Sequence, residues 1–195
     1  MTLEEYLRWE ERRPWRYEFV GGYAYALAGA TGGHNLVAGN VHYELRTAAR
    51  GHPCRIYQEG MKLRVGDDVY YPDVMVVCDP GGDDEQMAHA PCLLVEVLSP
   101  STTRTDRTQK LAAYRSIASL RAYLIVSREH RHVERHWRDG TGAWHVEDLL
   151  DRGEIPLPCP GAGAVLTLDA IYRYIAFPAP RRIRRVKEGA AAGTG

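Results

Sequence analysis

The chain has 195 residues, of which 45% are hydrophobic and 26% charged, the balance of a folded, soluble protein and not of a disordered one. Lys and Arg together number 25, and Asp and Glu together also number 25, so the formal net charge is zero. A protein that binds a polyanion through bulk positive charge is therefore excluded, but one with a local basic groove is not. No apolar run is long enough to span a bilayer, and the acidic, amphipathic N-terminus differs from a secretory signal, so we expect a cytoplasmic protein.

The first fifty residues predict a short helix, a β-hairpin and a longer helix. Thr2 followed by Glu5 is a capping box, which opens a helix that Pro14 ends. Residues 16–28 predict two strands that turn at Gly21-Gly22. The next segment has apolar residues at helical spacing, namely Val37, Val41, Leu45 and Ala48.

From Cys54 onward the hydrophobic period changes to two, which predicts a sheet. Two short strands at 55–58 and 62–65 precede a longer one at 69–78. The densely apolar run 92–98 predicts a central strand. The later segments predict a helix opened by Thr103 and Asp106, a strand at 121–126, a hairpin around Asp139-Gly140 and a short helix within 168–175.

This order of elements predicts an α/β fold in one domain over residues 1–177, with helices packed against a mixed sheet. Residues 178–195 combine prolines, arginines and a Gly/Ala-rich end, which predicts a disordered basic tail. Such a tail either helps to hold a polyanion or is only a solvated terminus, and the composition favours the second interpretation.

The four cysteines are Cys54, Cys78, Cys92 and Cys159. They form no C-x-x-C pair, which argues against a zinc ribbon or a thioredoxin-type site. The first three lie beside apolar, strand-like runs. We therefore expect reduced cysteines packed in the core.

Glu96 is the most informative residue, because it interrupts an apolar run that favours burial on both faces. Burying a carboxylate without a partner costs several kcal/mol. The sequence therefore predicts that a lysine, an arginine or a metal ion compensates the charge of Glu96.

Asp73 is a second carboxylate in a similar setting. It follows Pro72, whose missing N–H predicts an irregular or edge strand there, and precedes an apolar run. Two carboxylates on neighbouring strands form a hard-oxygen site suited to Mg²⁺ or Mn²⁺. The alternative is that each carboxylate caps a turn or pairs with an arginine. The presence of both Asp73 and Glu96 favours the metal site.

Lysine occurs only at positions 62, 110 and 187. Lys110 follows the Glu96 strand and is spaced to pair with Asp106 on a helix surface, a contact worth a few tenths of a kcal/mol. The functional alternative is that Lys110 leans toward Glu96. There it could orient a water molecule or stabilise negative charge on a phosphate.

Several segments together resemble the Uma-type restriction endonucleases of the PD-(D/E)XK nuclease-like superfamily. They are residues 71–74 (YPDV), 94–102 (LVEVLSPST), 106–110 (DRTQK) and 114–115 (YR), with 17–22 (YEFVGG) and 33–36 (GHNL) upstream. The resemblance extends from Thr2 to Tyr174. It implies a restriction-endonuclease-like core, in which helices flank a mixed central sheet and a divalent metal binds at the strand ends.

The resemblance also implies roles for individual residues. Asp73 and Glu96 would be metal ligands, with the Val97 carbonyl as a third. Glu18 matches an upstream glutamate that makes a further metal or water contact. Its alternative role is an ion pair with Arg16 in the hairpin.

One departure from the superfamily pattern concerns the motif lysine. In the strict pattern this lysine follows the glutamate by two residues, a position that Leu98 occupies here. Lys110 must then supply the ammonium from the helix, or the site is impaired. His34 begins a helix, where it either helps to bind a phosphate or makes ordinary hydrogen bonds, and we favour the second.

We therefore expect a Mg²⁺- or Mn²⁺-dependent endonuclease that hydrolyses phosphodiester bonds in DNA, with Lys110, Glu18, Asp73 and Glu96 as catalytic residues. The resemblance implies 3′-hydroxyl and 5′-phosphate products. Arginine-rich residues 46–55 could contact backbone phosphates, and a homodimer would suit cleavage of two strands. The alternatives are a catalytically impaired binding or regulatory module, which Leu98 favours, and a metal-dependent hydrolase with a different substrate.

Overall fold

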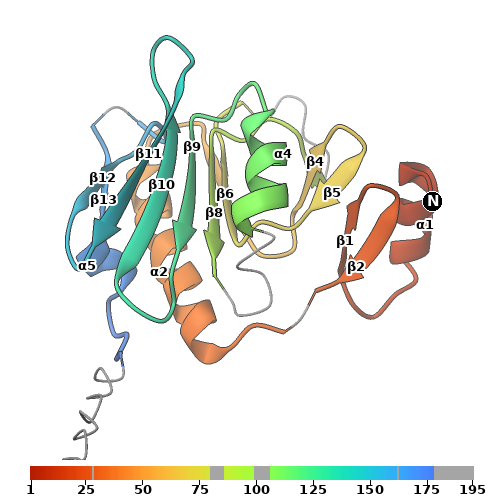
Figure 1. The fold of residues 1–195 in the computed structure, drawn as a ribbon, viewed down its shortest axis with the longest axis horizontal. Helices are drawn as coiled ribbons and strands as arrows, with labels where there is room; N and C mark the ends of the chain where they lie inside the picture. The colour runs from red at the N-terminus through yellow and green to blue at the C-terminus, as the bar shows by residue number, and fades with distance from the viewer. Residues whose placement is uncertain (28, 80–85, 99–105, 162, 178–195) are drawn as a thin grey trace, which may run out of the picture.

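The computed structural model describes residues 1–27, 29–79, 86–98, 106–161 and 163–177 (Figure 1). The predicted tail at 178–195 and the predicted helix start at Thr103 lie outside these residues. Within them, every helix is too short or too polar to traverse a bilayer.

The larger of two main sheets has six strands in the order β11-β10-β9-β8-β6-β3. β8 and β9 run parallel, and the other neighbours are antiparallel. The sheet is therefore mixed, as predicted, and β8 lies at its centre between β6 and β9. In chain order the strands are β3 (Arg55–Gln58), β6 (Val74–Val77), β8 (Leu93–Val97), β9 (Ala122–Val126), β10 (His132–Arg138) and β11 (Trp144–Leu150).

A second sheet has five strands in the order β2-β1-β5-β4-β7. These are β1 (Tyr17–Val20), β2 (Tyr23–Ala26), β4 (Lys62–Val65), β5 (Asp68–Tyr70) and β7 (Met87–Ala88). A separate two-stranded sheet pairs β12 (Glu154–Pro156) with β13 (Val165–Thr167). Our sequence analysis did not predict β7, β12 or β13, because segments of two or three residues are too short to display a period.

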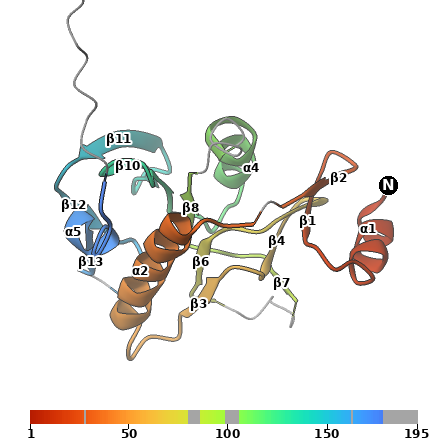
Figure 2. The ribbon, with the colours of Figure 1, turned by 90° about the horizontal axis from the view of Figure 1, so that it is seen from below.

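Helices cover both faces of the six-stranded sheet. α2 (Gly32–Ala48) packs on one face and α4 (Leu111–Arg115) on the other, as seen from below in Figure 2. The remaining helical segments are α1 (Leu3–Glu10), α5 (Leu168–Ile171) and a π-helical turn (Asp106–Lys110) that leads into α4.

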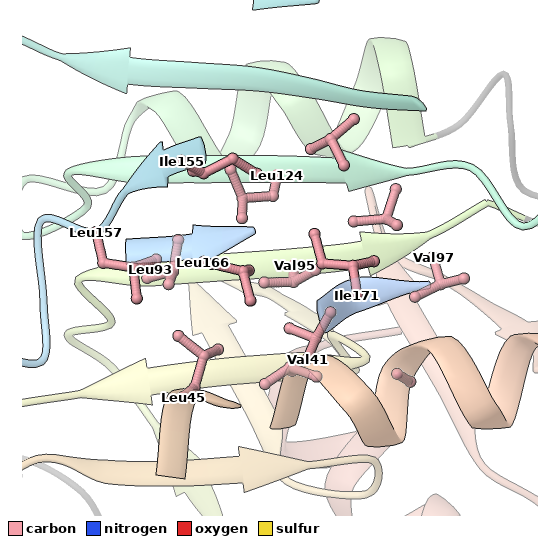
Figure 3. Packing of buried hydrophobic residues seen from close by; sticks show 14 of the residues in the cluster. Val41, Leu45, Leu93, Val95, Val97, Leu124, Ile155, Leu157, Leu166 and Ile171 are labelled. Atoms are coloured by element: carbon pink, nitrogen blue, oxygen red, sulfur yellow. The ribbon is translucent and has the colours of Figure 1, made fainter. Parts of the chain in front are cut away.

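Alternation along the strands explains the two apolar layers. Val95 of β8 belongs to the cluster under α2, together with Val41 and Leu45 of the helix (Figure 3). Its neighbour Leu94 points to the opposite face and packs in the cluster that contains Tyr114 of α4. Successive side chains of a strand face opposite sides, so β8 carries apolar residues on both faces, and Glu96 is its one charged residue.

The signals predicted near the N-terminus are confirmed. The N–H of Glu5 donates to the Thr2 hydroxyl, and the N–H of Thr2 donates to the Glu5 carboxylate, which completes the capping box. The β1–β2 turn lies at Gly21 and Gly22, with φ of 58° and 86°. Glycine adopts these positive values without the steric cost that other residues have.

The prediction of a single strand at 69–78 was wrong. The segment forms β5 and β6, which belong to different sheets, and the chain leaves strand geometry at Tyr71, Pro72 and Asp73. Proline has no N–H for a ladder hydrogen bond, so it suits the crossing between the sheets. Asp73 therefore stands at the start of β6 and not within a strand.

The prediction of reduced cysteines was also wrong. Cys54 forms a disulfide with Cys78, and Cys92 forms one with Cys159. Pairing of β3 with β6 sets Arg55 opposite Val77, which brings the flanking Cys54 and Cys78 together. Sequence spacing carries no information on such pairings, because they depend on strand order.

Candidate active site

The two carboxylates predicted as metal ligands lie on adjacent antiparallel strands. Val74 of β6 pairs with Val95 of β8, so Asp73 and Glu96 occupy the next positions toward the same end of the sheet. The N–H of Val97 donates to Asp73 Oδ2 at 2.6 Å. The main chain beside Glu96 thus holds the Asp73 carboxylate directly.

Glu96 is buried, with 4% of its surface exposed, and two side chains from the helical segment contact it. Lys110 Nζ donates to Glu96 Oε1 at 3.0 Å, and the hydroxyl of Tyr114 donates to the same oxygen at 2.8 Å. Lys110 and Tyr114 are four residues apart, so they project from the same side of the helical segment. A cation therefore compensates the buried carboxylate, as its setting in the sequence predicted.

Lys110 also reaches the second sheet. Its Nζ lies 2.9 Å from Oε1 of Glu18 on β1, an oxygen that accepts the N–H of Tyr71 at 3.3 Å. Lys110 is only 3% exposed and Glu18 only 7%. Lys110 is therefore not the exposed residue that the alternative, a surface ion pair with Asp106, would require. Glu18 pairs with Lys110, which joins β1, β8 and the helical segment.

In the sequence, Tyr114 was singled out only as part of the YR segment at 114–115. Burial raises the pKa of its hydroxyl well above the ordinary value of 10.0, and the nearby carboxylates of Glu96 and Glu18 raise it further. The hydroxyl therefore remains protonated and acts as a hydrogen-bond donor to Glu96. An aromatic residue four positions after a candidate lysine is the only signal that points to this contact.

His34, for which we favoured ordinary hydrogen bonds, contacts Asp73 through its side chain. Its Nε2 lies 3.2 Å from Asp73 Oδ2, and no hydrogen-bond partner for its buried Nδ1 is found among the described residues. Burial lowers the pKa of the imidazole, but the adjacent Asp73 carboxylate outweighs this, so the pKa is raised. Thr31 caps the start of α2, because its hydroxyl accepts the main-chain N–H of His34.

Leu98 does not contribute a polar group. It lies in the apolar cluster that includes Tyr114 and is 9% exposed. The position of the usual motif lysine is thus part of the core. An ammonium reaches Glu96 from the helical segment, through Lys110.

The donor set at this end of the sheet fits a hard divalent cation in its chemistry. Asp73 and Glu96 offer carboxylate oxygens and Val97 a main-chain carbonyl, the ligands that Mg²⁺ favours. Among the described residues, the acidic side chains here do not form a group of three within 4.8 Å of one another. Two carboxylates are sufficient in principle, since protein-bound Mg²⁺ usually keeps several waters.

The chain is similar in sequence to one protein family and to two individual proteins. The family model Uma2, described as "Putative restriction endonuclease", matches residues 3–170. Two uncharacterized proteins of Synechocystis sp., slr1290 and sll1609, are each 32% identical to the chain, over 180 and 155 residues. These matches cover 91% and 77% of this chain and 94% and 88% of the relatives.

A solved structure from Anabaena variabilis, titled as a putative nuclease belonging to DUF820, matches with a TM-score of 0.70. The match has 17% sequence identity and covers 90% of this chain and 99% of that one. At this identity the similarity concerns the fold, and the predicted restriction-endonuclease-like class is confirmed.

Proposed function

Because the chain belongs to the Uma2 (putative restriction endonuclease) family, we propose that it is a metal-dependent endonuclease that hydrolyses phosphodiester bonds in DNA. The observation that carries the proposal is the buried Lys110 ammonium, which lies between Glu18 and Glu96. Asp73 joins this group through the N–H of Val97. Buried charged groups in such an arrangement are costly for stability and are typical of functional sites.

Asp73, Glu96 and the carbonyl of Val97 are the proposed holders of Mg²⁺ or Mn²⁺. When bound, such an ion would polarise the scissile phosphate and help to deprotonate an attacking water. His34 keeps the Asp73 carboxylate in place from the side of α2. The Tyr114 hydroxyl and the Lys110 ammonium both donate to Oε1 of Glu96, and these two donors orient the carboxylate.

Lys110 is the proposed electrostatic catalyst. Its ammonium would stabilise the extra negative charge of the pentacovalent transition state or orient the water that attacks. Glu18 positions the ammonium from the opposite side, because Lys110 lies 2.9 Å from its carboxylate.

DNA is the proposed substrate, and a homodimer is the proposed arrangement for cutting both strands. Three arginines in the arginine-rich segment have exposed side chains and can contact backbone phosphates without base specificity, namely Arg46, Arg50 and Arg55. Such contacts would make binding salt-dependent.

Incubation with supercoiled plasmid tests the proposal. We expect wild-type protein to convert the plasmid to nicked and linear forms with Mg²⁺ or Mn²⁺, and EDTA to stop the reaction. A preparation of Glu96→Gln, purified in parallel, controls for contaminating nuclease. Cleavage of equal rate by both preparations, or no cleavage with either metal, would contradict the proposal.

The second candidate is a binding or regulatory module that retains the fold without the chemistry. The observation that favours it is the existing ion pairing, in which Lys110 already contacts two buried carboxylates while Leu98 fills the usual lysine position. Such a module would retain plasmid in a gel-shift assay with EDTA present and would never nick it.

A further inference from the structure

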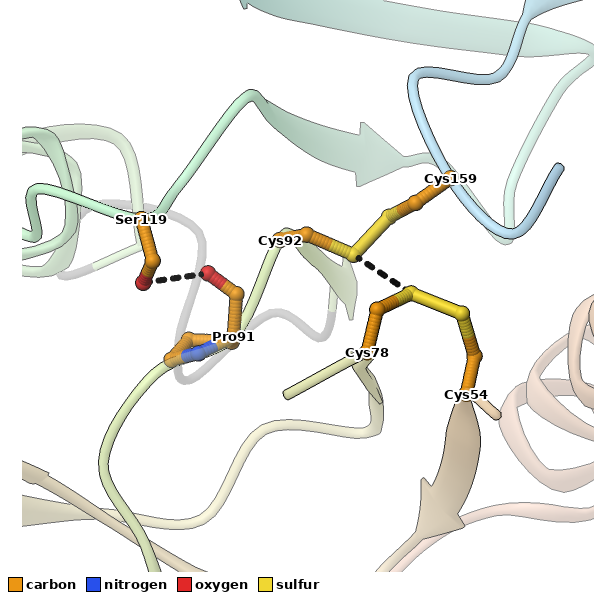
Figure 4. Close-up of a disulfide and its surroundings, with 6 residues drawn as sticks. All are labelled: Cys54, Cys78, Pro91, Cys92, Ser119 and Cys159. Carbon is orange, nitrogen blue, oxygen red and sulfur yellow. Dashed lines mark hydrogen bonds between the residues drawn. A yellow bond between two sulfur atoms is a disulfide. The ribbon is translucent and has the colours of Figure 1, made fainter. Parts of the chain in front are cut away.

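A second group of chemically reactive side chains lies far from the candidate active site along the same strands. Asp73 precedes β6 and Cys78 follows it, while Cys92 precedes β8 and Glu96 lies near its end. The cysteines therefore gather at the opposite end of β6 and β8 from the carboxylates. Cys159 joins them from the segment after β12 (Figure 4).

The two disulfides are in contact with each other. Sγ of Cys78 and Sγ of Cys92, which belong to different disulfides, are 3.6 Å apart (Figure 4). The sulfur atoms of Cys78, Cys92 and Cys159 all lie within 4.8 Å of one another. Cys54 is bonded to Cys78, so the sulfur atoms of all four cysteines occupy one small region.

We propose that these four cysteines, when their disulfides are reduced, form a binding site for one Zn²⁺ ion. Zinc in structural sites is bound tetrahedrally by four ligands with Zn–S distances of about 2.3 Å, so neighbouring sulfurs lie about 3.8 Å apart. The contact between Cys78 and Cys92 already has nearly this length. Cys159 lies within reach of both, and Cys54 completes the set once it is released from Cys78.

The chemistry of the donors selects the metal. Thiolates are soft ligands that favour zinc over Mg²⁺ or Mn²⁺, which the carboxylate site would take. Four cysteine ligands without an open position are typical of a structural zinc site and not of a catalytic one. Disulfides persist only in an oxidising environment, so the two states of the cluster correspond to two redox environments.

The positions of the ligands are fixed by the sheet. The N–H of Cys92 donates to the carbonyl of Val76 at 2.8 Å, and the carbonyl of Cys92 accepts the N–H of Arg121 at 2.9 Å. Cys54 and Cys78 flank paired residues of β3 and β6. Cys54, Cys78 and Cys92 each adjoin a strand of the six-stranded sheet, whereas Cys159, which is 6% exposed, belongs to the segment after β12, so a bound ion would tether that segment to the sheet.

Reduction of the two disulfides precedes metal binding. A phosphine reductant converts each disulfide and one water into two thiols and one phosphine oxide, so the chain consumes two phosphines and yields four thiols. Binding of Zn²⁺ then releases the four thiol protons and forms four Zn–S bonds.

Cobalt(II) titration of the reduced, chelator-treated full-length protein tests the proposal, because Co²⁺ reports its ligands by absorption. We expect sulfur-to-cobalt charge-transfer bands and the visible bands of tetrahedral Co²⁺, which saturate at one ion per chain and disappear when Zn²⁺ is added. Cys78→Ser should weaken binding by more than about 100-fold, since loss of even an outer-shell partner costs about 10–100-fold in metal affinity.

Ser119→Ala is the matched control. Its hydroxyl donates to the carbonyl of Pro91 next to Cys92, but it carries no sulfur (Figure 4). It should bind cobalt like wild type. Cys54→Ser, which retains the other three thiols, serves if Cys78→Ser does not fold, and it should also lose the four-sulfur spectrum. A folded, fully reduced protein that shows no charge-transfer band, or an unchanged spectrum in both serine variants, would overturn the proposal.

Discussion

Replacing Lys110 with methionine is expected to lower the rate of metal-dependent plasmid cleavage by at least about 100-fold, the typical cost of removing one donor that stabilises transition-state charge. The affinity for Mn²⁺ should stay largely intact, because the carboxylates that would hold the ion are unchanged. Cleavage kinetics and calorimetric Mn²⁺ titration of the same preparation measure the two quantities. A variant that cleaves as fast as wild type would show that Lys110 is not the missing motif lysine.

Lys110→Met is also expected to destabilise the fold. Lys110 forms ion pairs with both Glu18 and Glu96, and breaking a buried ion pair by removing one partner costs about 3–5 kcal/mol of stability. Circular dichroism should therefore accompany the kinetics. Lys62→Met is the matched control, because Lys62 makes a comparable ion pair at 3.0 Å, with Glu10 and not with Glu18 or Glu96. It should lose stability and keep its cleavage rate.

Replacing Asp73 with asparagine is expected to abolish detectable cleavage. A divalent ion supplies several kcal/mol of transition-state stabilisation, and each 1.36 kcal/mol is tenfold in rate, so the loss should exceed about 1,000-fold. Asparagine is nearly isosteric and its amide oxygen can still accept the N–H of Val97. The fold should therefore persist, which separates this variant from a merely unfolded one.

Asp67→Asn is the matched control for this second prediction. Asp67 pairs with Arg64 at 3.6 Å, and 91% of its side chain is exposed, so its loss should change neither stability nor rate appreciably. Equal cleavage by Asp73→Asn and Asp67→Asn would mean that the carboxylate at the start of β6 has no part in the reaction.

The sequence predicted those parts of the site that depend on strand patterns. Glu96 stands in a run that favours burial, so a compensating cation was required, and the structure places Lys110 beside it. Asp73 follows Pro72, whose missing N–H predicts an interruption, and the chain indeed passes between two sheets there. The catalytic and metal-binding roles of these residues stay predictions.

The contacts that the sequence could not predict depend on how separate elements pack. His34 reaches Asp73 only because α2 crosses the face of the sheet at that point. Tyr114 reaches Glu96 because α4 covers the other face. The disulfides depend on the spatial order of β3, β6 and β8, which no local pattern reveals. β12 and β13 pair through only three residues each, too few to display a period in the sequence.

Calorimetric titration of Mn²⁺ into wild-type protein and Glu96→Gln, both in the disulfide-bonded state, tests most directly whether the carboxylates at the ends of β6 and β8 hold a divalent ion. We expect one Mn²⁺ site per chain in the wild type and its loss in the variant, with both proteins folded. Binding of equal strength by the two proteins, or a wild type that takes up no ion, would contradict it.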